Sequence, residues 1–135
     1  MNKRTHTIQK AAVLCSLVLL VLFSGCSKYI SSYKALGFIH TNTSKNAYMG
    51  FHSFEGRMVF TLKSKGEGEI KYTASLDEGS AIVSYDCYGT KSELFTIESG
   101  ESFESSGGYI EEGTVYIIVE TDGKCKGGEF RFSLE

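Results

Sequence analysis

Apolar and polar positions alternate along most of the chain after residue 46. The clearest stretch is 69–76, and 58–62 and 81–87 repeat its period of two. Successive side chains of a strand point to opposite faces, so each stretch predicts a strand with one face in a core and the other in water. The side chains predicted to face inward from 69–76 are Ile70, Tyr72, Ala74 and Leu76.

Turn-forming residues separate further stretches of this kind. The segment 114–121 is apolar on both faces, which predicts a central strand covered on both sides. The segment 101–108 is polar apart from Phe103 and predicts an edge strand or a loop. We expect turns at Glu55-Gly56 and, as a hairpin, at 77–79. The other predicted strands are 35–40, 47–54, 57–63, 80–87, 92–97 and 129–135, with a polar loop at 41–46.

These strands and the absence of a helical pattern after residue 26 predict an all-β fold. We expect an antiparallel β-sandwich of about seven to eight strands, either jelly-roll-like or immunoglobulin-like. The composition agrees, because 9 Phe, 8 Tyr and 15 Gly without any Pro or Trp are typical of β-sheet proteins.

The first 25 residues differ from the rest. A cationic segment, 1–10, precedes thirteen uncharged residues, 11–23. This apolar run is short for a helix that must cross about 30 Å of hydrocarbon, so it predicts the helix of a secretory signal peptide. The positive end stays inside, which places the rest of the chain outside the cytoplasm.

Ser24-Gly25-Cys26 ends this run and resembles the lipobox of small bacterial lipoproteins. Phe23 departs from the motif, which more often has Leu there. The resemblance implies that Cys26 becomes the first mature residue and carries two or three acyl chains such as palmitate. Two chains make a stable membrane anchor. An uncleaved membrane anchor and a plain secretory signal cut nearby are the alternatives.

The resulting organisation is a signal peptide at 1–25, then the lipidated Cys26, a tether and a first strand within 26–46, and a sandwich at 47–135. The tether, 27–34, reaches at most about 26 Å. The predicted location is therefore extracytoplasmic, lipid-anchored to a bacterial cell membrane.

Charge excludes one class of partner. The chain has 14 basic and 16 acidic residues, and loss of Lys3, Arg4 and Lys10 with the signal peptide leaves 11 basic residues and a net charge of −5. Nucleic-acid-binding domains carry basic surfaces, so no nucleic-acid partner is expected.

The cysteines divide by position. Cys15 leaves with the signal peptide and Cys26 carries the lipid, which leaves Cys87 and Cys125. A cysteine pair in an exported chain indicates a disulfide, so this pair is the candidate. Two free thiols and a metal-binding pair are the alternatives.

Candidate chemistry is sparse. No nucleophile elbow, zinc motif or phosphate-binding loop is present, so we expect no catalytic residue, no metal site, no cofactor and no enzymatic activity. His40 and His52 are interpreted as surface histidines. Weaker hypotheses are a Ca²⁺ site at Glu111, Glu112, Glu120 and Asp122, and carbohydrate binding on Tyr85, Tyr88, Tyr109 and Tyr116.

The segments 113–119, 122–123 and 128–134 look like the closing hairpin of bacterial pre-peptidase C-terminal domains, which implies a jelly-roll sandwich. We therefore expect a non-catalytic binding or structural domain that contacts an envelope protein or glycan. The alternative is an accessory module that binds a cation or a carbohydrate through its loops.

Overall fold

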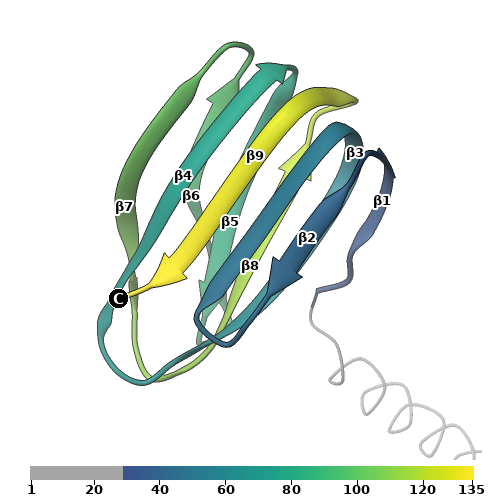
Figure 1. Ribbon diagram of the computed structural model, residues 1–135. Coiled ribbons are helices and arrows are strands. Elements are labelled where there is room, and N and C mark those ends of the chain that lie inside the picture. The colour runs from purple at the N-terminus through teal and green to yellow at the C-terminus, as the bar shows by residue number, and fades with distance from the viewer. Residues whose placement is uncertain (1–28) are drawn as a thin grey trace, which may run out of the picture.

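The computed structural model describes residues 29–135, which form nine antiparallel strands without a helix (Figure 1). Residues 1–28, with the predicted signal peptide and Cys26, lie outside the described residues. No helix within 29–135 is long and apolar enough to cross a membrane. The strands are β1 (Ser32–Leu36), β2 (Ile39–Asn42), β3 (Asn46–Ser64), β4 (Gly68–Glu78), β5 (Ser80–Cys87), β6 (Thr90–Glu98), β7 (Ser102–Ile110), β8 (Gly113–Thr121) and β9 (Cys125–Leu134).

The strands form two layers that share β3 (Figure 1). The first half of β3 pairs with β9 in sheet I, where the order is β3-β9-β4-β7. The second half pairs with β8 in sheet II, where the order is β3-β8-β5-β6. This is a jelly-roll arrangement. The predicted antiparallel sandwich is confirmed and has nine strands: β1 and β2 replace the single strand expected at 35–40, β3 replaces the two expected at 47–54 and 57–63, and β7 forms at 101–108.

The turn predicted at Glu55-Gly56 is wrong, because β3 continues through it. Before this point Met49 and Phe51 face the core, whereas after it Met58 and Phe60 do. The strand passes from sheet I to sheet II here. Gly56 has a φ of 131°, and a β-carbon on it would overlap the backbone of β1. A glycine is therefore required where the two strands approach so closely.

The hairpin predicted at 77–79 is also wrong. β4 pairs with β7 and β9, whereas β5 pairs with β6 and β8. Gly79, with a φ of 112°, therefore lies in a crossing between the sheets. Of the two alternatives predicted for 101–108, the edge strand is observed, since β7 lies at one end of sheet I.

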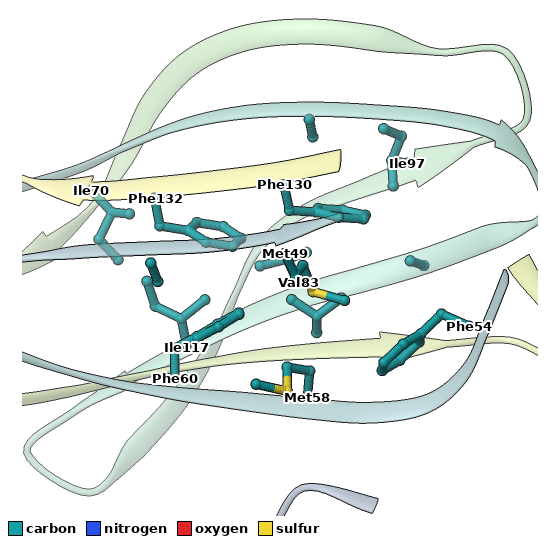
Figure 2. Close-up of a cluster of buried hydrophobic side chains, with 14 of the residues drawn as sticks. Met49, Phe54, Met58, Phe60, Ile70, Val83, Ile97, Ile117, Phe130 and Phe132 are labelled. Atoms are coloured by element: carbon teal, nitrogen blue, oxygen red, sulfur yellow. The ribbon is translucent and has the colours of Figure 1, made fainter. Parts of the chain in front are cut away.

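The core lies between the two sheets (Figure 2). Phe60 of β3 and its register partner Ile117 of β8 are fully buried, and Phe130 of β9 is 1% exposed. Burying one such side chain contributes about 1.5 to 3 kcal/mol relative to leaving it in water. The pattern at 69–76 is confirmed, because Ile70, Ala74 and Leu76 are buried.

The outer face of β8 is covered by the start of the described chain. The Tyr29 ring lies 5.4 Å from the ring of Tyr116, and the Tyr29 hydroxyl donates a hydrogen bond to Asp86. Ser31 Oγ accepts a hydrogen bond of 2.9 Å from the Val59 amide. The central position predicted for 114–121 is confirmed. Within the segment predicted as a tether, Tyr29 and Ser31 contact sheet II.

Candidate functional site

The candidate disulfide is absent, because Cys87 and Cys125 are both free. Cys87 ends β5, whereas the Cys125 thiol lies 3.3 Å from the carbonyl oxygen of Ser80, which begins β5. Seven residue steps of strand separate those ends by about 23 Å. A disulfide needs α-carbons within about 7 Å, so the fold keeps the two cysteines apart.

The acidic residues considered for Ca²⁺ do not converge. Glu111 and Glu112 precede β8, whereas Asp122 follows it, so they lie at opposite ends of a nine-residue strand. Glu120 instead pairs with Lys91 at 2.7 Å and Arg57 at 3.4 Å. No group of three metal-ligating side chains was found within residues 29–135.

The Glu120 ion pairs also affect its ionisation. The hydrogen bond from Lys91 is the largest cause that lowers the pKa of Glu120, and Arg57 acts in the same direction. This network occupies the outer face of sheet II, beside the residues covered by Tyr29.

The four tyrosines considered as a carbohydrate platform do not share a surface. Tyr85 packs against the core, and Tyr116 lies beneath Tyr29. Tyr88 lies in the β5–β6 turn, where its hydroxyl donates to the Glu112 carbonyl. Tyr109 lies on the edge strand β7, where its hydrogen bond with Glu67 is the main cause that raises its pKa to about 12.

The two histidines are surface residues, as predicted. His40 and His52 are both exposed. The His40 ring stacks on Phe38 with centroids 5.0 Å apart, so it packs against an aromatic side chain.

The structure places an open groove on the outer face of sheet I. It consists of two adjoining depressions of about 640 and 510 Å³, both bordered by Tyr48. These volumes fall within the range of about 300 to 1,000 Å³ typical of small-molecule sites. We call them together the sheet I groove.

Strand register determines which side chains line the groove. Directly paired residues of neighbouring strands point to the same face, so they form rows across the sheet. One row contains Thr41, Tyr48, Arg131, Thr73 and Glu104. The next contains Asn46, Ser133, Lys71 and Ser106. Hydroxyl, amide and charged groups therefore dominate, with one aromatic ring in the two rows.

Tyr48 is held in place from several directions. The Arg131 guanidinium lies 4.4 Å from its ring centroid, and its hydroxyl donates a 3.2 Å hydrogen bond to Glu129. Burial is the main cause that raises the pKa of Tyr48, followed by the charge of Glu129. A β-carbon on Gly50 would overlap the Tyr48 hydroxyl. The glycine thus leaves room for the tyrosine to lie across the sheet.

Sequence reasoning missed this groove. Tyr48, Thr73 and Arg131 are far apart in the chain, and only the pairing of β3, β9 and β4 brings them into one row. Their outward positions on alternating strands were the available signal. That signal equally fits a solvated face, so it did not identify a site.

No protein-family model and no curated protein sequence matches the chain. Solved structures do resemble it. TmCBM61, solved in complex with β-1,4-galactotriose, is 14% identical over 78% of this chain and 87% of that chain, with a TM-score of 0.49. A family 6 carbohydrate-binding module is 17% identical over 77% of this chain and 87% of that chain, with a TM-score of 0.41.

A pre-peptidase C-terminal domain of a collagenase from Bacillus anthracis is also similar. It is 10% identical over 78% of this chain and 90% of that chain, with a TM-score of 0.44. All three TM-scores are below 0.5, so the function is argued from the side chains of this chain.

Proposed function

We propose that this chain is a lipoprotein, anchored outside the cytoplasm through Cys26, whose β-sandwich binds a glycan without catalysis. The observation that supports glycan binding is the sheet I groove, with its rows of hydroxyl, amide and charged side chains beside Tyr48. The sequence Ser24-Gly25-Cys26 after a short apolar run supports the anchor.

The chemistry of the groove suits a ligand rich in hydroxyl groups. A sugar hydroxyl both donates and accepts hydrogen bonds, and the groove offers hydroxyls on Thr41 and Thr73 beside the amide of Asn46. An apolar ligand would leave these groups without partners, at a cost of about 1 to 3 kcal/mol each when they are buried. The groove is open along the sheet, so an extended chain fits better than a compact molecule.

The charges in the groove favour a neutral glycan. The groove lining carries two basic residues, Arg131 and Lys71, and three acidic residues, Asp77, Glu104 and Glu129, so positive charge does not dominate. Lys71 is also paired with Glu135 at 2.8 Å. A polyanion would meet these carboxylates. The middle strands of sheet I are paired on both sides, which keeps these groups in fixed positions.

Affinity electrophoresis of the detergent-solubilised protein tests this function. Gels containing a soluble galactan, a mannan or a polyuronate are compared with a gel without polysaccharide. We expect a neutral polysaccharide to retard the protein, and Arg131→Ala to weaken retardation about tenfold, since one lost charged hydrogen bond costs about 1.4 kcal/mol or more. Arg57→Ala is the matched control, because Arg57 pairs with Glu120 on sheet II.

Two results would count against the proposal. Equal mobility in all gels would remove support for a glycan ligand. Retardation that Arg57→Ala weakens as much as Arg131→Ala would place binding outside the sheet I groove.

A further inference from the structure

Exposed apolar side chains are concentrated near the start of the described chain. Seven large hydrophobic residues are exposed within 29–135, and four of them lie between residues 30 and 39. These four are Ile30 at 65%, Tyr33 at 40%, Leu36 at 64% and Ile39 at 67%. Clustering of this kind marks an interaction surface, whereas isolated exposed apolar residues are ordinary.

The cluster lies along one edge of the sandwich. β1 and β2 both pair with β3, the strand that the two sheets share, on the edge opposite β8 and β9. Figure 1 shows β1 and β2 on the side of the molecule where the described chain begins, and β7 on the opposite side. We call residues 30–42 the β1–β2 edge.

The β1–β2 edge differs from the rest of the described chain in lacking acidic residues. All 16 acidic residues of the chain lie in residues 55–135, so the β1–β2 edge contains none. It contains Lys34 and His40. The first acidic residue, Glu55, is the register partner of Lys34 across β1 and β3. Lys34 is the one formal charge of the edge at pH 7, and an apolar edge with a cation and no acidic residue is compatible with a bilayer that contains anionic headgroups.

A lipid on Cys26 would be tied close to this edge by the length of the chain. Three residue steps separate Cys26 from Tyr29, a reach of at most about 11 Å. Tyr29 itself is held on sheet II by its ring contact with Tyr116 and its hydrogen bond to Asp86. A lipid on Cys26 would therefore hold the neighbouring edge, and not the far edge at β7, near the membrane.

We propose that the β1–β2 edge is a membrane-contact surface that orients the domain on its bilayer. Ile30, Leu36 and Ile39 enter the interfacial region of the lipids, and Lys34 faces their headgroups. Ile39 also borders the sheet I groove, so the groove then opens at the membrane surface. This inference rests on the proposed lipid anchor at Cys26.

The absence of tryptophan from the chain makes a direct test available. Single tryptophans are introduced into the full lipidated protein as Leu36→Trp and Ile39→Trp, with Tyr109→Trp as the control. Tyr109 is 58% exposed and lies on β7, at the opposite edge. Each protein is reconstituted into phosphatidylcholine–phosphatidylglycerol vesicles whose acyl chains are brominated, and flotation isolates the bound fraction.

Fluorescence of the floated protein gives the result. We expect brominated lipid to quench Leu36→Trp and Ile39→Trp at least about twofold more than Tyr109→Trp, because interfacial side chains enter about 5 to 10 Å into the lipid. Equal quenching at the three positions would overturn the membrane contact while leaving the anchor intact. Failure to float would overturn the anchor and the contact together. Fluorescence that is blue-shifted without quenching would assign the edge to a second copy of the chain and overturn the proposal.

Discussion

Tyr29 and Asp86 connect the beginning of the described chain to the body of the sandwich. Asp86 is 1% exposed, and besides Tyr29 its carboxylate accepts a 2.8 Å hydrogen bond from the Gly89 amide. A buried carboxylate is costly unless hydrogen bonds compensate it, so these contacts determine where the N-terminal segment binds.

Tyr29→Phe tests this contact. Burial is the main cause that raises the pKa of Tyr29 to about 12, followed by the hydrogen bond to Asp86. A raised pKa means that the hydroxyl contributes stability below about pH 10, its unfolded pKa, and that this contribution is lost as pH rises through about 12. We expect Tyr29→Phe to lower the free energy of unfolding by about 1 kcal/mol at neutral pH. Urea denaturation measures the change.

The pH dependence separates this effect from a general loss of packing. The difference between wild type and Tyr29→Phe should shrink as the pH rises from about 10 towards 12. Tyr33→Phe is the control, since the Tyr33 ring packs on Phe38 and Phe54. A difference that stays constant over this pH range would contradict the role given to the Tyr29 hydroxyl.

The two cysteines should react differently. Cys125 is fully buried, and burial is the main cause that raises the pKa of its thiol, whereas Cys87 is half-buried. We expect a thiol reagent to label Cys87 in the folded protein and to label Cys125 only after unfolding, because the thiolate is the reactive form. Mass spectrometry of peptides identifies each site. If neither cysteine were labelled in urea without reductant, the two would be bridged after all.

At the scale of strands, β3 is the element on which the architecture depends. It takes part in both sheets and pairs with β1 and β2 at the edge opposite β8 and β9. Its crossing requires the close approach of Gly56 to Ser32 and Tyr33 of the N-terminal segment. The Gly56 amide also donates a 2.9 Å hydrogen bond to Thr121 Oγ1, which joins the crossing to the end of β8.

Gly56→Ala should therefore be strongly destabilising. The positive φ of 131° is unfavourable for alanine, and the new β-carbon would collide with the β1 backbone. We expect a loss of about 3 kcal/mol from strain and overpacking together. Gly66→Ala is the matched control, because no atom lies within 4 Å of the β-carbon position there. Thermal denaturation compares the two, and similar melting temperatures would contradict the close contact.

The period of two predicted which side chains of a strand face the core, but it did not predict how the strands are connected. The inward residues of β4 follow from alternation alone, because a period of two is a property of the strand itself. The turns predicted at Glu55-Gly56 and 77–79 are wrong because a glycine permits a positive φ without indicating whether the chain reverses its direction there. That choice depends on which strands pair, and the pairs are distant in the sequence.

For the whole molecule, the arrangement joins three surfaces with different roles. The β1–β2 edge is proposed to contact lipid, the outer face of sheet I carries the groove, and the outer face of sheet II is partly covered by Tyr29 and the Glu120 ion pairs. Edge and groove are adjacent, since both depressions include residues of β2. A membrane-bound domain could thus present a ligand site close to the bilayer.

Cys26→Ser tests the anchor at this scale. Removal of the thiol eliminates the group that would receive the lipid, so we expect the protein to leave the detergent phase or to keep its signal peptide. Phase partition with Triton X-114 and intact mass measure the two outcomes. Ser27→Ala is the control, because it retains the thiol. A Cys26→Ser protein processed and membrane-held like wild type would contradict lipidation.

The sequence by itself determined the class of the fold, the inward faces of its strands and the short apolar run that predicts export. These are local properties, encoded by a period of two or by a continuous stretch of residues. Only the tertiary structure decided that Cys87 and Cys125 lie at different ends of the sandwich, that Tyr48 and Arg131 share a groove, and that β3 serves both sheets. Those features depend on pairing between distant strands, and a single sequence does not record which strands become neighbours.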